Sequence, residues 1–190
     1  YGERLAVLAG DALIVLAFEM LAEGAVAAPA RLPPMLVLLA QRVGMPLGIT
    51  AGQAWECEDW VARPDYQRAK TGSLFTAAVE LGALSAGADP GLWRGFGEWL
   101  GEAYQVADDI RDAACDEAQL GKPAGRDHAL ARPSAVAEYG LSGALRHFER
   151  LVGRAGDAVP EGPGARALRG LLMAEADRLL PPAVRQRAAA

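Results

Sequence analysis

Apolar residues recur along the chain at helical spacing, and punctuating glycines and prolines divide them into segments. Helix formers dominate and β-branched residues are sparse, so the pattern predicts an all-α chain. The tail after residues 181–182 is expected to fray. We expect helices over about residues 3–23, 35–59, 65–86, from 90 through a cluster of aspartates, 134–139, 142–156 and 164–180, with loops at 25–34 and 160–163.

Capping and small residues refine these boundaries. Asp65 and Ser142 stand where a helix N-cap is expected, because their side chains can accept backbone N–H bonds. Gly44, Gly48 and Gly52 recur at every fourth position of the second predicted helix. Small residues at that spacing let another helix or a ligand come close, and tight helix packing is the favoured interpretation.

Length and composition predict one globular domain. The chain has 190 residues, of which 52% are hydrophobic and 23% are charged, enough for a sizeable core. The net charge is −5 and no basic stripe is present, which argues against nucleic acid as a partner. We therefore treat residues 1–190 as a single domain.

The cysteines and histidines limit which metal sites and disulfides the chain could form. Cys57 and Cys115 lack metal-ligand spacing and are interpreted as free thiols of a reducing compartment such as the cytoplasm. Only two histidines occur, His128 and His147, which argues against a histidine-based zinc site.

The apolar run from Leu5 to Leu21 is interpreted as a buried helix. It contains Asp11 and Glu19 and lacks the basic region and cleavage site of a signal peptide. We expect no membrane span. The chain opens on Tyr1 without a methionine, so we expect it to begin inside a longer protein.

The candidate chemistry centres on Asp108, Asp109 and Asp112. On a helix, Asp108 and Asp112 share a face, and Gln105 lies one turn earlier on it. Crowded carboxylates repel each other unless a cation lies between them, and hard oxygen ligands suit Mg²⁺. The alternative is a solvated acidic patch at a helix end.

A basic loop follows these acids directly and favours the metal interpretation. Residues 121–126 read Gly-Lys-Pro-Ala-Gly-Arg, with Lys122 and Arg126 as the cations. Acids that hold a metal, followed by bases that hold a phosphate, are typical of a metal–diphosphate site.

Two further polar groups lie within apolar helices. Lys70 and Thr71 precede a glycine and would offer an ammonium and a hydroxyl to a phosphate, although an isolated lysine there is more simply a surface residue. Gln53 is either a structural hydrogen-bonding residue or a polar group on the wall of the same cavity.

Five motifs together resemble the trans-polyprenyl diphosphate synthases, in that family's order. The match covers residues 1 to about 139, and its details look most like geranylgeranyl diphosphate synthases of photosynthetic, carotenoid-making bacteria. The motifs are Leu-Ala-Gly-Asp-Ala-Leu at 8–13, Gly-Gln at 52–53, Lys-Thr-Gly at 70–72, Gln105 with Asp-Asp-Ile-Arg-Asp at 108–112, and residues 121–127.

The resemblance implies a fold and a reaction. Family members are all-α isoprenoid-synthase bundles around a central cavity, usually homodimers, that condense an allylic diphosphate with isopentenyl diphosphate using three Mg²⁺ ions. Geranylgeranyl diphosphate is the favoured product.

The resemblance also implies roles for individual residues. It makes Asp108 a direct Mg²⁺ ligand, with Asp109 and Asp112 acting largely through metal-bound water. The other substrate-binding residues that it implies are Lys70, Lys122, Arg126 (where a lysine is usual), Gln53 on the cavity wall, and Thr71 and Gln105 near the reacting carbons.

The sequence departs from the family pattern at one point, and this leaves alternative functions open. No first aspartate-rich motif occurs between Tyr1 and Tyr104, so we expect the N-terminal helices of the bundle to be missing and the chain alone to be inactive. The alternatives are a non-catalytic subunit of a heteromeric synthase, another class I terpene synthase, and a helical structural domain. The intact aspartates argue against the first, and the lack of an Asn/Ser/Glu triad against the second.

Overall fold

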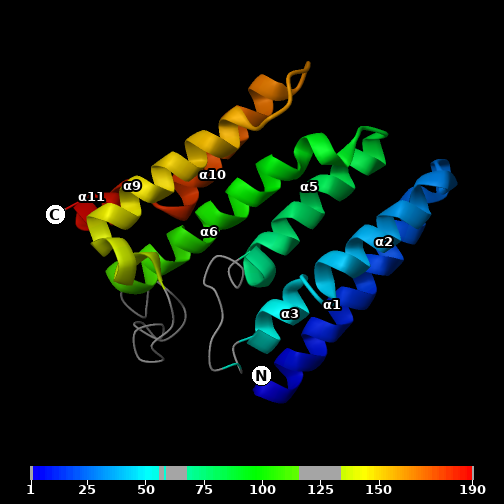
Figure 1. The fold of residues 1–190 in the computed structure, drawn as a ribbon, viewed down its shortest axis with the longest axis horizontal. Helices are drawn as coiled ribbons and strands as arrows, with labels where there is room; N and C mark the ends of the chain where they lie inside the picture. The colour runs from blue at the N-terminus through cyan, green and yellow to red at the C-terminus, as the bar shows by residue number, and fades with distance from the viewer. Residues whose placement is uncertain (1, 56–57, 59–67, 116–133, 190) are drawn as a thin grey trace.

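The structure, a computed structural model, describes residues 2–55, 58, 68–115 and 134–189 and is a bundle of helices lying side by side (Figure 1). All regular structure in those ranges is helical, which confirms the all-α prediction. The helices are α1 (Glu3–Gly24), α2 (Leu32–Val43), α3 (Ile49–Ala54), α5 (Ser73–Ala86), α6 (Arg94–Ala114), α9 (Ala135–Asp157), α10 (Ala165–Leu179) and α11 (Pro182–Ala189). Short helical turns are η1 (Ala25–Ala27), η2 (Pro29–Arg31), η4 (Arg68–Gly72) and η5 (Pro90–Trp93).

Two predicted boundaries near α2 are wrong. The expected loop to residue 34 ends early, because Pro33 and Pro34 fit the first turn of α2, where no N–H is needed. The single helix expected over 35–59 is interrupted between Val43 and Ile49. Gly44 and Pro46 lie in that break, and proline cannot donate the bond that would continue the helix. The predicted helix end at 59, like the Asp65 cap, lies outside the described residues.

The predicted break between the helices over 134–139 and 142–156 corresponds to a kink inside α9. Gly140 has φ 68° and ψ 169°, a conformation that a residue with Cβ rarely adopts. Ser134 caps α9 by accepting the N–H of Ala137 at 3.1 Å. The expected Ser142 cap is wrong, since the Ser142 hydroxyl donates to the carbonyl of Ala188 at 3.1 Å.

The main core lies where α6, α9, α10 and α11 pack together. Its largest fully buried apolar side chains are Phe148, Ile110, Leu151 and Leu180. The predicted fraying of the tail is wrong because α11 buries Val184 and Ala188 against this core. The core thus holds α6, the helix of the aspartates, on one side.

Helix α1 contradicts the expectation of a buried helix. It lies along α2 at the edge of the bundle (Figure 1), and none of its described residues is buried. Leu13 is 65% exposed and Val15 66%. By length and composition alone, residues 3–27 could cross a membrane, which is weak evidence because core helices and signal sequences pass the same test.

Candidate active site

Glycines let α5 and α6 cross closely, and this crossing positions the site. A Cβ at Gly97 would lie 2.7 Å from Thr76 Cα, and a Cβ at Gly101 would lie 2.8 Å from Gly72 Cα. Real Cβ atoms do not approach so closely, so the two backbones touch only because both positions are glycine. The contact places the start of α5 beside the α6 turn that carries Gln105.

The side chains at this crossing form a hydrogen-bonded chain. The Thr71 hydroxyl donates to Gln105 Oε1 at 2.8 Å, and Gln105 Nε2 donates to Asp109 Oδ1 at 2.9 Å. Asp109 Oδ2 accepts the backbone N–H of Ala135 at 2.7 Å. Three residues from two predicted motifs, one on η4 and one on α6, are therefore brought together and joined to the start of α9.

The chain has a fixed direction. A carboxylate only accepts hydrogen bonds, so Gln105 turns its NH₂ group toward Asp109 and its carbonyl toward Thr71. The Thr71 hydroxyl then has to donate its proton to that carbonyl. The oxygen of Thr71 keeps lone pairs available for another group.

Lys70 lies on the π-helical turn η4, next to Thr71. A Cβ at Gly52 would lie 2.6 Å from Lys70 Cα, so α3 and η4 are in backbone contact. This confirms tight packing as the role of Gly52, and single π-helical turns are frequent at functional sites. Lys70 is half-buried, whereas Gln53, beside Gly52, is exposed.

The three aspartates differ in exposure. Asp109 is 3% exposed and Asp112 7% exposed, while Asp108 is half-buried and the most open. Among the described residues, no group of three His, Cys, Asp or Glu side chains lies close enough to hold a metal ion alone. Carboxylate oxygens of Asp108 and Asp112 fit Mg²⁺, whose remaining ligands are usually water and substrate phosphate.

Two predicted diphosphate ligands, Lys122 and Arg126, lie outside the described residues, as does Cys57. Cys115 is a free, half-buried thiol at the end of α6.

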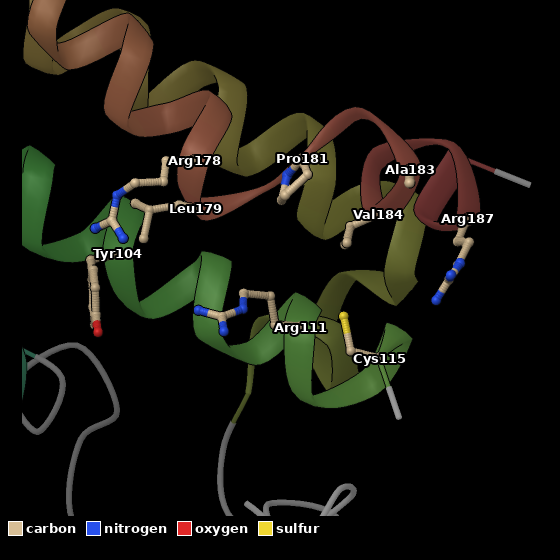
Figure 2. Close-up of a pocket in the computed structure, with 9 residues that line it drawn as sticks. All are labelled: Tyr104, Arg111, Cys115, Arg178, Leu179, Pro181, Ala183, Val184 and Arg187. Atoms are coloured by element: carbon tan, nitrogen blue, oxygen red, sulfur yellow. The ribbon is translucent and has the colours of Figure 1, made fainter. Parts of the chain in front are cut away.

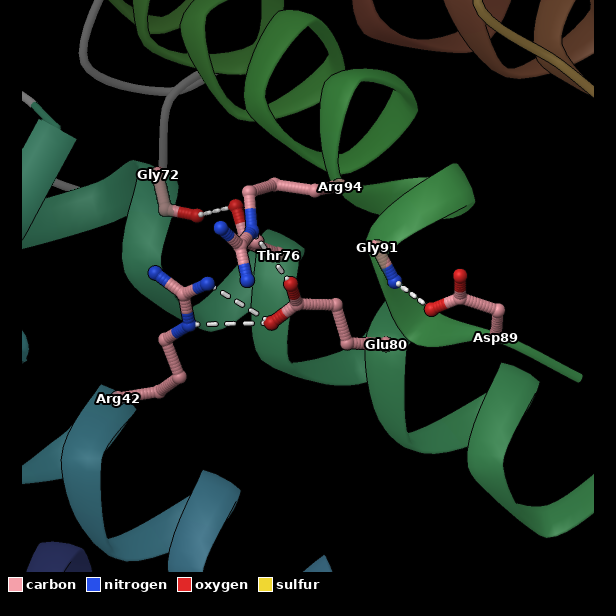
Figure 3. A network of polar contacts seen from close by, with 7 residues as sticks. All are labelled: Arg42, Gly72, Thr76, Glu80, Asp89, Gly91 and Arg94. Carbon is pink, nitrogen blue, oxygen red and sulfur yellow. Dashed lines mark hydrogen bonds and ion pairs between the residues drawn. The ribbon is translucent and has the colours of Figure 1, made fainter.

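Sequence reasoning missed a buried ion cluster next to the crossing (Figure 3). Glu80 on α5 is fully buried, and its carboxylate accepts from Arg42 Nη2 at 2.8 Å and from Arg94 Nε at 2.7 Å. The hydrogen bond to Glu80 raises the pKa of Arg94. A glutamate inside the apolar run of α5 was the available signal, because a buried carboxylate needs cationic partners.

A separate pocket of about 410 Å³ opens between α6, α10 and α11 (Figure 2). None of Thr71, Gln105 and Asp109 lines it. One of its cations, Arg178, is paired with Glu175, and this hydrogen bond lowers the pKa of Glu175. The lining residues are Tyr104, Arg111, Cys115, Arg178, Leu179, Pro181, Ala183, Val184 and Arg187.

Comparison with known proteins identifies similar sequences. The polyprenyl synthetase family model matches residues 1–159. A geranylgeranyl diphosphate synthase of Cereibacter sphaeroides is 46% identical over 187 residues, which is 98% of this chain and 65% of that protein. A geranylgeranyl diphosphate synthase of Rhodobacter capsulatus is 41% identical over 180 residues, 95% of this chain and 62% of that protein. The chain thus spans slightly less than two thirds of both relatives.

Solved structures share the fold. A geranyltransferase of Helicobacter pylori, crystallised with magnesium and isoprenyl diphosphate, superposes with a TM-score of 0.78 at 26% identity. The similarity covers 94% of this chain and 62% of that one.

Proposed function

Because the chain belongs to the polyprenyl synthetase family, we propose that it serves a prenyltransferase that joins an allylic diphosphate to isopentenyl diphosphate. The product that we propose is geranylgeranyl diphosphate. The observation that carries this proposal is the 46% identity to a geranylgeranyl diphosphate synthase across 98% of the chain. The free thiol and the bacterial relatives support a cytoplasmic location.

The reaction requires stabilisation of the negative charge that develops on the diphosphate and of the positive charge that develops on the allylic carbons. Its C–O bond breaks with the electron pair on the diphosphate, the double bond of isopentenyl diphosphate forms the new C–C bond, and a proton leaves. Asp108 and Asp112 would hold Mg²⁺, which supplies positive charge to the diphosphate when bound. Water must be excluded from the carbocation while it exists.

The other residues divide into two roles. We assign Lys70 to the diphosphate, because an ammonium forms charge-assisted hydrogen bonds with phosphate oxygens. We assign the oxygens of Thr71 and Gln105 to the carbocation, because preorganised dipoles stabilise a charge that develops beside them. Lys122 and Arg126 remain proposed diphosphate ligands, and Gln53 remains a proposed cavity-wall residue.

We also propose that the protein is a homodimer. The support is the unburied apolar surface of α1, where Leu13 and Val15 are each about two thirds exposed. Apolar surface of this extent marks an interaction site more often than free surface. The resemblance to a family of homodimers favours a second copy as the partner.

The activity is tested with the purified intact protein, labelled isopentenyl diphosphate, Mg²⁺ and allylic diphosphates of five, ten and fifteen carbons. We expect a twenty-carbon prenyl diphosphate. Shorter products alone would refute the assigned product and leave prenyl transfer standing. Release of diphosphate without C–C bond formation between two substrates would refute prenyl transfer and favour a terpene synthase. No turnover of any allylic substrate would favour a non-catalytic subunit.

A further inference from the structure

Asp109 is the most buried of the three aspartates. Its side chain is 3% exposed, whereas that of Asp108 beside it is half-buried. Each Asp109 oxygen already accepts a hydrogen bond, Oδ1 from Gln105 at 2.9 Å and Oδ2 from the Ala135 backbone at 2.7 Å. Both of these donors are neutral and held by the fold, so one lone pair of each oxygen is engaged, and a side chain that is 3% exposed leaves little room for a cation with its water ligands.

We propose that Asp109 is a positioning residue. It orients Gln105 and Thr71 toward the reacting carbons and fixes the first turn of α9, and it does not supply an oxygen to Mg²⁺. This inference rests on the proposed function, because Gln105 and Thr71 matter to catalysis only if prenyl transfer takes place. It leaves Asp108 as the direct metal ligand and Asp112 as a partner of the metal through bound water.

The bond to Ala135 ties two elements that are distant in sequence. The first N–H groups of a helix have no partner inside it and favour a negative acceptor. At the start of α9, Ser134 satisfies the N–H of Ala137 and Asp109 satisfies that of Ala135. Ala135 is fully buried, so water cannot replace the carboxylate there. Asp109 therefore sets where α9 begins relative to α6.

The bond to Gln105 sets the direction of the hydrogen-bonded chain. Thr71 could accept from Gln105 or donate to it, because a hydroxyl does both. Only the carboxylate of Asp109 forces the Gln105 amide to point its NH₂ away from Thr71. The carbonyl of Gln105 and the lone pairs of Thr71 are thereby presented together, as stabilisation of a carbocation requires.

Substitution by asparagine isolates this role. The two donors lie at different oxygens of Asp109, and an asparagine side chain places an accepting oxygen at only one of these two positions. If it keeps the bond to Ala135, its NH₂ meets Gln105, and the Gln105 amide has to reverse. The variant keeps the size of the side chain and loses either the cap or the orientation of Gln105.

The experiment compares D109N with D108N and with S134A, which removes the other cap of α9. Mg²⁺ binding is measured by calorimetry with inorganic diphosphate, backbone exchange at Ala135 by hydrogen exchange, and kcat by product formation. For D109N we expect Mg²⁺ affinity within about twofold of wild type, faster exchange at Ala135, and a kcat lower by about tenfold or more. For D108N we expect weaker Mg²⁺ binding with unchanged exchange at Ala135, and for S134A unchanged Mg²⁺ binding.

The outcome that overturns the proposal is a loss of Mg²⁺ affinity in D109N as large as in D108N, with exchange at Ala135 unchanged. If D109N does not fold, wild-type protein provides the test. A positioning residue keeps the Ala135 amide protected when Mg²⁺ and diphosphate are added, and faster exchange there would show that Asp109 turns from Ala135 toward the metal. Failure of prenyl transfer in wild type would overturn the proposed function alone, because the calorimetry and the exchange need no turnover.

Discussion

Asp108, Asp109 and Asp112 are near neighbours in sequence, yet their environments give them different chemistry. Asp108 is open enough to meet a substrate, while Asp109 is closed in by Gln105 and the start of α9. A carboxylate acts on a metal only through oxygens that can reach it. Our proposal therefore separates Asp108 from Asp109 by burial and hydrogen bonding rather than by residue type.

For Asp108 we predict that substitution by alanine abolishes most activity without unfolding the protein. A half-buried carboxylate at the proposed metal site contributes charge stabilisation and little packing, so kcat should fall by about 10² to 10³ while thermal unfolding stays unchanged. Turnover at saturating Mg²⁺ and circular dichroism melting check this. Near-normal turnover would remove Asp108 from the site.

The family resemblance predicted that Lys70, Thr71, Gln105 and the aspartates belong to one site, and the structure joins Thr71, Gln105 and Asp109 directly. It could not predict the Asp109 bond to Ala135, 26 residues away, because that depends on how α9 packs on α6. The metal, Lys122 and Arg126 assignments stay predictions.

Between helices, the closest contacts depend on residues that lack a side chain. The α5–α6 crossing needs Gly97 and Gly101, and the α3–η4 contact needs Gly52. The predicted small-residue pattern in residues 44–52 was correct for packing at Gly52, but the matching stripe on α6, with Gln105 one turn beyond Gly101, was overlooked. That stripe is visible in the sequence, since glycines four apart predict a close helix contact.

We predict that Gly101→Ala lowers both stability and activity. Its Cβ would lie 2.8 Å from the backbone of Gly72, so α5 has to move away and the Thr71–Gln105 bond lengthens. Overpacking of this kind costs about 1–3 kcal/mol. Urea unfolding and kcat measure the two effects.

Gly82→Ala on α5 is the matched control. Nothing lies within 4 Å of its added Cβ, so alanine should stabilise the helix by about 0.5–1 kcal/mol with activity unchanged. Equal stability losses at positions 82 and 101 would show that helix contact is not the cause.

Glu80 connects three elements, and we predict that Glu80→Gln is strongly destabilising. Arg42 on α2 and Arg94 at the start of α6 would lose the charge of the fully buried carboxylate that they share. Removal of one partner of a buried ion cluster lowers the free energy of unfolding by about 3–5 kcal/mol. We expect a value at the lower end of this range because Arg94 is partly exposed to water. Urea unfolding of Glu80→Gln and of the exposed control Glu98→Gln measures the loss of stability. Equal urea midpoints for the two variants would contradict the prediction.

Most helix locations could be predicted from sequence, because periodicity and prolines report local preferences. The failures have tertiary causes. The tail forms α11 because Val184 and Ala188 bury against the core, although local signals favour fraying. Ser142 is no cap because its hydroxyl contacts α11.

Across the whole molecule, apolar surface is distributed unevenly. The core lies among α6, α9, α10 and α11, while α1 at the opposite edge buries none of its described residues. The hydrophobic periodicity correctly predicted that these residues form a helix. The prediction that the helix is buried was wrong, because a sequence pattern does not reveal which surface, if any, covers an apolar face. The proposed homodimer would cover this face of α1.

The last prediction tests that assembly. Leu8 and Val15 lie two helical turns apart on one face of α1 and are 61% and 66% exposed. If a second copy covers this face, Leu8→Glu with Val15→Glu would bury two unpaired charges at the interface and convert the dimer to monomer, as light scattering after gel filtration would show. The control Glu23→Lys, at an exposed position on the same helix, should remain a dimer. A wild-type protein that is monomeric and sediments with lipid vesicles would instead show that α1 binds a membrane, whereas a double variant that stays dimeric would place the interface elsewhere.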